Sequence, residues 1–523
     1  MAAPGYTTDL QTFDLAEDTG NWVEFTNMSG GGAPAEDDGD NEIQGSFMTS
    51  QTCNTTGLVS VGKVRTGVTL SAGEVFLVWH QLSSPGAMDT YANGGMRLVV
   101  GTDEGNWKAW AVGGNVTSPN PYGGWQNNPV DPTITHEYSL GTPPTSTYAA
   151  VGSACNLLSG IFKGNPHQCD AIRYGRADAR MNGGETANYA TFAGYAAVND
   201  IKDNRWGLIQ SVAGGFLWKG LMTLGYVSAV DFRDSNAIIF VQDTRKVSAG
   251  FNKIEVRQSG SRVDWTGISI QALGTVSRGA LEAIDNADIN LDSCTFTDMG
   301  MFAFLSNSTI LSTIFRRCGQ VTQGGGTLTG CLFEYSPDTV AVLSDNPTVI
   351  TGCTFKSSGT GHAVRCDTQG EYSWSGNFDS GYAGTRGSNP TPNSGSANDM
   401  FYNNSGGLIT LNVAGGGQSP SVRNGVDATT VVNATVTVTI IANVSLVGAE
   451  VRIYDLDTTP PDYGTELAGT ESHGTSTYVY AGTGSNVIQI QIMKDGYVEY
   501  AQEYTMPTND SDLDILLKPE ENA

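Results

Sequence analysis

The stretch TGCTFKSSG, residues 351–359, places a cysteine and a phenylalanine two positions apart, and the spacing recurs in GCLF at 330–333 and SCTF at 293–296. Aligned, these stretches belong to a longer series in which a small residue precedes a phenylalanine by two positions. The series comprises Cys294/Phe296, Thr313/Phe315, Cys331/Phe333, Cys353/Phe355 and Gly376/Phe378, with phenylalanines separated by 19, 18, 22 and 23 residues. Self-similarity at such a period indicates stacked structural repeats.

Each repeat opens with a short alternating segment, as in ADINLDSCTF and TVITGCTFKS, and ends in polar or glycine-rich residues. A strand followed by a turn, repeated about every 20 residues, predicts a parallel β-helix, because each coil buries its inward side chains against neighbouring coils. Cys294, Cys331, Cys353 and the paired phenylalanines are then expected to form interior ladders. A leucine-rich solenoid is the competing repeat, but its Leu/Asn consensus is absent.

Looser repeats at 237–261 and 262–286 extend the series backwards, so the coils are expected to start near residue 200 or slightly before. We predict an all-β chain with three domains: an N-terminal β-sandwich of lectin or jelly-roll type at 1–170, a right-handed parallel β-helix at 171–415, and an immunoglobulin-like domain at 416–523. The stretch AGGGQSPSVRNG, 414–425, is predicted to be a linker from its Gly/Ser/Pro content.

Strand-like pieces broken by Gly, Pro and Asn predict the N-terminal sandwich. At the other end, ATVTVTIIANVSLVGAEVRIYDLD (434–457) alternates strongly, and IQIQIMKDGYVEYAQEYTM (488–506) is two alternating runs joined by Lys494-Asp495-Gly496, a hairpin signal. The closing PEENA is expected to be disordered.

The formal net charge of −26 disfavours nucleic acid as a ligand, because no dense Lys/Arg cluster offsets it. The opening MAAPGYTTDL lacks the features of a secretory signal, and no uncharged apolar run reaches about 18 residues. We therefore expect synthesis in the cytoplasm without membrane insertion. Eight cysteines without CxxC spacing predict reduced, buried thiols.

Parallel β-helices can carry polysaccharide-cleaving sites, so acidic residues in the coils are candidates. These are Asp292, Asp298, Glu334, Asp338, Asp367 and Asp379, with the nearby bases Arg316, Arg317, Lys356 and Arg365. Glycoside hydrolysis needs two carboxylates about 5–10 Å apart, and adjacent coils could bring Glu334 near Asp379. His362 near Asp367 is the one histidine–carboxylate pair in the repeats.

Other candidate sites have simpler explanations. Cys155, His167 and Cys169 could suggest zinc but lack paired CxxC spacing and a fourth ligand. The acidic run 36–42 departs from calcium-loop spacing. The aromatic residues of 106–114 and 122–125 could form a sugar platform, although core packing explains them more simply. We assign no catalytic, cofactor-binding or metal-binding residue.

Longer strings suggest a relationship: DAIRYGRADARMNGG (170–184), VDFRDSNAIIFVQDTRKVS (230–248), VDWTGISIQALGTVSRG (263–279) and LITLNVAGGGQSPSVRNG (408–425). Over most of its length the chain resembles a group of largely uncharacterised tailed-bacteriophage proteins with pectate-lyase-like β-helices. The resemblance implies a virion structural protein and a homotrimer in contact with other virion proteins. No catalytic residue carries over.

The favoured hypothesis is a structural or adhesion component of a phage particle (tail spike, tail fibre or capsid-attached appendage) that acts as a rigid spacer and contacts host surface glycans. The alternative is a polysaccharide-degrading tailspike enzyme with an acidic groove on the β-helix. A bacterial surface adhesin is a weaker third reading because an export signal is missing.

Overall fold

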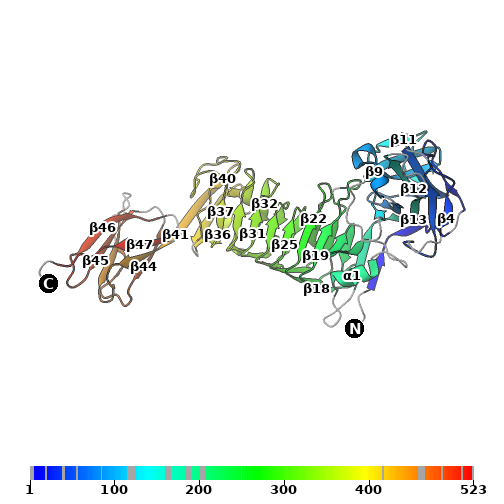
Figure 1. Ribbon diagram of the computed structural model, residues 1–523. Helices are drawn as coiled ribbons and strands as arrows, with labels where there is room; N and C mark the ends of the chain where they lie inside the picture. Colours follow the sequence, from blue (N-terminus) through cyan, green and yellow to red (C-terminus); the bar gives the residue numbers. More distant parts are fainter. Residues whose placement is uncertain are drawn as a thin grey trace. The chain divides into compact units, whose positions relative to one another are not determined.

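The computed structural model is all-β, with long parallel sheets consistent with a β-helix (Figure 1). It describes residues 5–17, 20–37, 42–54, 57–83, 85–114, 125–158, 166–182, 190–199, 208–248, 250–414, 417–456, 464, 466–483, 487–507 and 511–520. The chain divides into two compact units, Met1–Asn307 and Ser308–Ala523. Each is considered by itself below.

Two antiparallel sheets form the first part of the N-terminal unit. One contains, in spatial order, β4 (Ala35–Asp37), β5 (Met48–Thr52), β13 (Pro166–Gly175), β7 (Val75–Leu82) and β10 (Gln126–Asn127), with β2 (Gln11–Asp14) also paired to β13. The other contains β3 (Trp22–Val23), β6 (Gly57–Thr69), β12 (Thr147–Leu157), β8 (Met96–Asp103), β9 (Asn106–Gly113) and β11 (Tyr138–Leu140). Short 3-10 turns lie at η1 (Pro85–Ala87) and η2 (Tyr91–Asn93).

The two sheets share one hydrophobic core. Phe76 and Val78 of β7 pack with Leu98 and Val100 of β8 and with Trp110 of β9. Every residue of β7 is buried. The strand is covered on both faces because Trp79, which alternates with Phe76 and Val78, belongs to a separate buried cluster.

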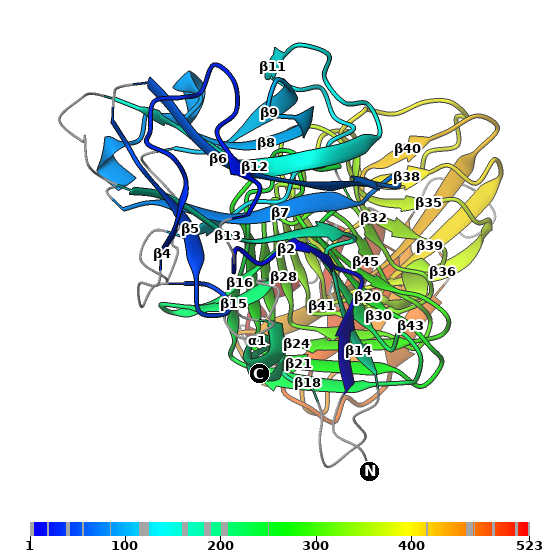
Figure 2. The same cartoon turned by 90° about the vertical axis from the view of Figure 1, so that its right-hand side faces the viewer.

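The same unit continues into coils that each supply strands to three parallel stacks. Stack 1 contains β18 (Asp231–Ser235), β21 (Arg262–Thr266) and β24 (Asp288–Asp292), drawn side by side in Figure 2. Stack 2 contains β16 (Gly215–Trp218), β19 (Ile238–Val241), β22 (Ser269–Ala272) and β25 (Thr295–Thr297), with β15 (Ile209–Val212) antiparallel to β16. Stack 3 contains β14 (Asp178–Asn182), β17 (Leu221–Leu224), β20 (Lys253–Val256), β23 (Ala280–Ala283) and β26 (Phe302–Ala303). β1 (Gly5–Thr8) pairs antiparallel with β14, and α1 (Phe192–Asn199) precedes β15.

The C-terminal unit begins with coils of the same strand order. Stack 1 contains β27 (Thr309–Leu311), β30 (Thr327–Thr329), β33 (Ile350–Thr351), β36 (Gly370–Ser375), β39 (Leu408–Ala414) and β41 (Thr429–Ala442). Stack 2 contains β28 (Ile314–Arg316), β31 (Leu332–Glu334), β34 (Thr354–Lys356) and β37 (Phe378–Ser380). Stack 3 contains β29 (Val321–Thr322), β32 (Val340–Ser344), β35 (His362–Cys366), β38 (Phe401–Asn403) and β40 (Val422–Asn424). A 3-10 turn, η4 (Pro347–Val349), precedes β33.

A left-handed residue marks the bend between stack 1 and stack 2 in successive coils. Gly330, Gly352 and Gly376 have φ of 63°, 63° and 64°, and Ser312 has φ 46° at the equivalent place. Glycine adopts this conformation without the steric cost that a side chain imposes. The residue that follows each bend points into the coil interior. This explains why a small or polar residue recurs at the position after the bend.

The interior ladder predicted from Cys-x-Phe is confirmed for the central repeats. Phe315, Phe333 and Phe355 stack with ring centroids 4.9 and 5.0 Å apart and interplanar angles of 4° and 8°. Cys331 and Cys353 are fully buried beside them. In the N-terminal unit, Cys294 and Phe296 are buried in the same way.

The predicted inward orientation of the fifth phenylalanine in the series is wrong. Phe378 pairs with Thr354, not with Phe355, and its side chain is 46% exposed. The register follows the bend glycine, so Asn377 takes the cysteine position and Asp379 takes the phenylalanine position. Asn377 Oδ1 accepts a hydrogen bond from the Cys353 amide (2.9 Å), and its Nδ2 donates to the Ile350 carbonyl (2.7 Å). The interior therefore becomes polar towards the later coils.

The linker predicted at 414–425 is also wrong. β40 pairs with β38 inside this stretch, and β41 pairs with β39 from Thr429 to Ala434. The same β41 continues as a sheet strand that pairs antiparallel with β44 (Tyr478–Thr483) and parallel with β47 (Ser511–Ile515). A continuous strand thus joins the last coil to the C-terminal sheets.

The second C-terminal sheet contains β43 (Glu466–Thr470), β42 (Glu450–Asp455), β45 (Val487–Met493) and β46 (Tyr500–Thr505), all antiparallel. β45 and β46 are the two alternating runs of the predicted hairpin, and that prediction is confirmed. Ile453, Ile490 and Val438 belong to the core that both sheets share. Of the tail predicted to be disordered, Glu520 donates its amide to the Gly496 carbonyl, and residues 521–523 lie outside the described residues.

Candidate functional site

Glu334, the main acidic candidate, lies at the end of β31 between two basic residues in register. Arg316 precedes it on β28 and Lys356 follows it on β34. Its carboxylate receives Arg316 Nε at 2.8 Å and Lys356 Nζ at 2.7 Å. These two hydrogen bonds, from Lys356 first and then from Arg316, lower the pKa of Glu334. The carboxylate stays ionised, and the residues in register with it on β28 and β34 are cations, so neither adjacent strand places at that position the second carboxylate that glycoside hydrolysis requires.

Asp379, the proposed partner of Glu334, points into the coil interior. It aligns with Phe355, and its side chain is 1% exposed. Arg386 Nη1 donates to its Oδ1 at 2.7 Å, and its own amide donates to Gln418 Oε1 at 3.0 Å. The structure therefore does not bring Asp379 together with Glu334, and Asp379 anchors the segment that follows β37.

The remaining acidic candidates serve turns and local ion pairs. Asp338 Oδ2 accepts the Gln320 amide at 2.7 Å, and Asp292 Oδ1 accepts the Ser293 hydroxyl at 2.9 Å. Asp298 occupies a left-handed position with φ 57°. Arg317 occupies another, with φ 50°, and donates its amide to the Glu334 carbonyl.

His362 is not paired with Asp367. Its Nδ1 lies 2.7 Å from the carbonyl oxygen of Asp399, and Arg423 Nη1 lies 3.3 Å from its Nε2. Asp367 instead holds Arg365 by two hydrogen bonds of 2.7 and 2.9 Å. Burial lowers the pKa of His362, and Arg423 lowers it further, although the hydrogen bond to Asp399 acts the other way. A neutral ring that donates from Nδ1 and accepts at Nε2 satisfies both contacts.

His362, Arg365 and Arg423 line an open pocket of about 450 Å³ on stack 3 of the C-terminal unit. β35 supplies His362 and Arg365, β38 supplies Tyr402 and β40 supplies Arg423. The residues lining the rest of it come from the first residue of β32 and from the turns before β32, β35 and β38: Val340, Thr339, Gly359, Thr360, Gly361, Ser396, Ala397 and Asn398. Pockets of this size hold small organic ligands.

The parallel register forms an alternating row of basic and aromatic side chains in the pocket. Arg365, Tyr402 and Arg423 occupy the same position on three successive strands. The guanidinium carbon of Arg423 lies 4.9 Å from the Tyr402 ring centroid, and that of Arg365 lies 5.9 Å away. The His362 ring is 4.9 Å from the same ring. Tyr402 thus orients two cations at one side of the pocket.

No sequence motif marks Tyr402 or Arg423 as site residues. They lie 40 and 61 positions after His362, and only the coil register brings the three together. A correct alignment of stack 3 would have revealed the row. The strands of stack 3 lack the cysteine–phenylalanine marker that makes stack 2 visible.

The predicted metal candidates of the N-terminal unit are structural. His167 lies on β13 with its Nε2 2.9 Å from the Ser153 hydroxyl, and burial lowers its pKa to about 3. Burial raises the pKa values of the Cys155 and Cys169 thiols, so both stay protonated. Within the described ranges, no three His, Cys, Asp or Glu side chains form a possible metal-binding group. Residues 38–41 of the acidic run lie outside those ranges.

The aromatic residues that could have formed a sugar platform pack in the hydrophobic core, as the simpler interpretation predicts. Trp107 and Trp110 on β9 are buried, as is Trp125, and their indole groups therefore offer no exposed face to a sugar. The Trp110 indole donates to the Thr135 carbonyl and the Trp107 indole donates to the Thr26 carbonyl, both at 3.1 Å. Residues 122–124 lie outside the described part of the chain.

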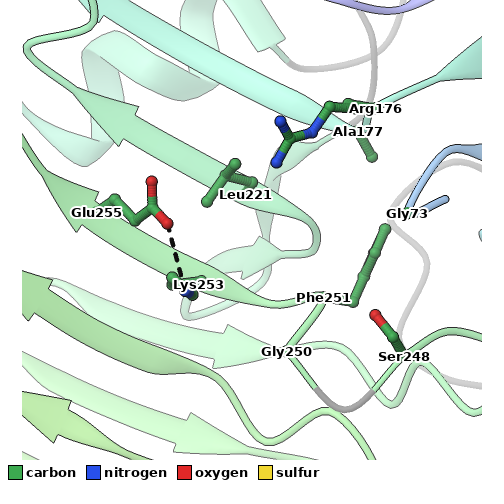
Figure 3. A pocket seen from close by; sticks show the side chains of 9 residues that line it. All are labelled: Gly73, Arg176, Ala177, Leu221, Ser248, Gly250, Phe251, Lys253 and Glu255. Atoms are coloured by element: carbon green, nitrogen blue, oxygen red, sulfur yellow. Dashed lines mark ion pairs between the residues drawn. The ribbon is translucent and has the colours of Figure 1, made fainter. Parts of the chain in front are cut away.

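A smaller pocket of about 140 Å³ lies in the N-terminal unit, where Arg176, Phe251 and Lys253 surround it (Figure 3). Glu255 and Glu282 hold the Lys253 ammonium at 3.3 and 3.0 Å. With Lys253 neutralised and little volume, this pocket is a weaker candidate than the one at His362.

No protein family profile matches the chain, and no curated protein matches it. The described residues include no helix with the length and apolar character needed to cross a membrane.

Proposed function

We propose that the chain is a structural or adhesion component of a bacteriophage virion, as a tail spike, tail fibre or capsid-attached appendage. The observation that supports a spacer role is the stack of Phe315, Phe333 and Phe355, with rings nearly parallel and about 5 Å apart. Identical side chains repeated at the coil spacing fill the interior densely, and dense packing resists bending. The phage setting rests on the sequence resemblance.

The terminal regions would serve as contact modules. We propose that the two N-terminal sheets form a lectin-like or jelly-roll-like sandwich and that the C-terminal sheets form an immunoglobulin-like domain. Two sheets with a shared core in each region, antiparallel except for the β41–β47 pair, support this interpretation. The hydrogen-bonded passage of β41 from coil to sheet would transmit force between the β-helix and the C-terminal domain.

We further propose a homotrimer, made in the host cytoplasm and incorporated into the particle beside other virion proteins. Mass photometry of the purified 55.1 kDa chain tests the assembly. A species at three times the chain mass supports the proposal. A single 55.1 kDa species at micromolar concentration contradicts it.

Particle membership needs a separate experiment. Mass spectrometry of purified phage particles from the source of the sequence should detect the chain at a stoichiometry comparable to that of other tail or capsid proteins. Detection in the host lysate together with absence from purified particles would refute the virion role.

The polysaccharide-cleaving alternative gains no support from Glu334, whose neighbours are Arg316 and Lys356. Incubation with host capsular or lipopolysaccharide glycans tests it directly. Sustained release of oligosaccharides would overturn the purely structural proposal.

A further inference from the structure

We propose that the pocket formed by His362, Tyr402 and Arg423 binds an acidic saccharide, meaning a sugar ring with hydroxyl groups and one carboxylate. The proposal deepens the proposed surface-contact function and rests on it for its biological setting. The binding chemistry itself depends only on the pocket.

Arg423 supplies the anion-binding group. Within the described residues, no carboxylate lies within 4 Å of its guanidinium, and its one hydrogen bond runs from Nη1 to His362 Nε2. Its other N–H groups remain available, and Arg423 itself lines the pocket. An unpaired guanidinium is unusual in a chain with a formal charge of −26, where carboxylates outnumber basic groups. A bound carboxylate would accept two N–H groups in the bidentate geometry that arginine favours.

The surroundings hold Arg423 in place without neutralising it. His362 accepts a hydrogen bond as a neutral ring, and Tyr402 packs against the guanidinium. The nearest acidic influence is Asp399, which is buried. Its Oδ2 accepts the Ser396 amide, and its backbone carbonyl faces His362. The Asp399 carboxylate thus binds the Ser396 amide and its carbonyl orients His362, and among the described residues it forms no ion pair with Arg423.

The size and charge of the pocket favour a carboxylate over a phosphate. Arg365 is the second cation in the row, but Asp367 already binds it through two hydrogen bonds. Only one positive charge is left for a ligand, and it matches a monoanion better than a phosphate that carries up to two charges. The ligand thus needs one negative charge on an otherwise neutral body.

The rest of the pocket lining suits a sugar body. Thr339 and Thr360 line the pocket, and the described residues give their hydroxyl groups no hydrogen-bond partner. Val340 and Ala397 add apolar surface. A sugar ring has hydroxyl groups at its edge and C–H groups on its faces, so both kinds of lining find a counterpart. An inorganic anion would leave most of the 450 Å³ pocket unfilled.

The test compares four probes on the full chain by isothermal titration calorimetry: D-glucuronic acid, N-acetylneuraminic acid, D-glucose and inorganic phosphate. Saturation-transfer NMR provides a second measurement for the three sugars. At least one acidic sugar should bind with a Kd of about 0.1–10 mM, typical of a single sugar contact, and glucose should bind at least ten-fold more weakly. Binding of phosphate as tight as that of the acidic sugars would reduce the site to a plain anion site and overturn the proposal. Absence of binding by both acidic sugars, or equal binding of glucose, would overturn it too.

Two variants assign the binding to the pocket. Arg423→Gln should weaken acidic-sugar binding at least ten-fold, whereas the matched control Arg316→Gln, which removes an arginine from a different stack, should leave it unchanged. If Arg423→Gln fails to fold, Arg423→Lys is used instead. It keeps the positive charge but loses the bidentate guanidinium geometry, so the affinity for the acidic sugar should fall several-fold. Unchanged binding in a folded Arg423 variant would place the site elsewhere. Trimer mass and particle membership are measured without any sugar, so failure of this proposal is distinct from failure of the proposed function.

Discussion

Replacing Phe333 by alanine should strongly destabilise the coils of the C-terminal unit. The ring is buried and stacked between Phe315 and Phe355, so alanine removes its transfer free energy and leaves a cavity that two rings border. Phenylalanine-to-alanine substitutions at such sites cost about 3–5 kcal/mol. With a urea m-value of about 1–3 kcal/mol per molar, the unfolding midpoint should fall by about 1 M or more.

Phe378→Ala is the matched control, because it alters a phenylalanine of the same sequence series whose side chain on β37 is exposed. Its side chain is 46% exposed, so alanine loses roughly half of a ring's burial and creates no cavity, a cost of about 1 kcal/mol. Urea titration measures the free energy of unfolding of both variants. Hydrogen exchange of peptides from β28, β31 and β34 then shows whether the loss of stability lies in these coils. Equal destabilisation by the two substitutions, or a cost below about 1.5 kcal/mol for Phe333→Ala, would refute the register and the interior ladder.

Four further results are expected. Cys353→Ser should cost about 1–2 kcal/mol in a urea titration, because a hydroxyl replaces a fully buried thiol, and should leave acidic-sugar binding intact. Ser312→Gly should stabilise the same coils by about 0.5–1 kcal/mol, since the residue has φ 46°; a loss of stability would contradict the bend assignment. Glu334→Gln should change the free energy of unfolding by no more than about 1 kcal/mol, because both basic partners are partly exposed. The variant and the wild type should behave alike when incubated with glycans. Burial lowers the pKa of Lys219 to about 7, whereas in the unfolded chain it is about 10.4, so the unfolded state binds more protons between these pH values. The thermal midpoint of the wild type should therefore rise with pH, relative to that of Lys219→Met, across about pH 7–10. Parallel pH profiles of the two proteins would exclude this titration.

The repeat was predictable because stack 2 displays like residues at like positions. Cys331 and Cys353 precede Phe333 and Phe355 by the same two positions, and the parallel register aligns them as expected. The prediction failed at Phe378 because it followed the aromatic residue instead of the bend. Gly352 and Gly376 share a left-handed φ, and aligning them places Asp379 under Phe355. Backbone conformation, not side-chain identity, sets the coil phase.

The candidate site was less predictable than the fold. Acidic residues were selected because glycan chemistry uses them, but Glu334 and Asp379 meet basic partners that lie in neighbouring coils or in the following turn. Whether a charge is neutralised depends on such long-range register. The pocket depends on it in the same way, since His362 and Arg423 meet only after two further coils have been added.

The linker prediction failed for a related reason. Gly, Ser and Pro between 414 and 425 resemble a flexible connection, yet Val422–Asn424 still completes a coil. Polar interior residues made this coil hard to recognise. Asn403 and Asn424 are buried, and Asn403 Nδ2 donates to the Thr429 carbonyl while Asn424 Oδ1 accepts the Thr430 hydroxyl. At these positions asparagine hydrogen bonds replace the buried apolar side chains that make the earlier coils recognisable.

A cryo-EM map of the intact phage particle tests the central claim most directly. We predict an appendage in which three copies of the chain can be traced, with the phenylalanine-stacked coils of Phe315, Phe333 and Phe355 resolved in each. A map that accounts for every appendage and capsid protein without this chain would contradict a virion role.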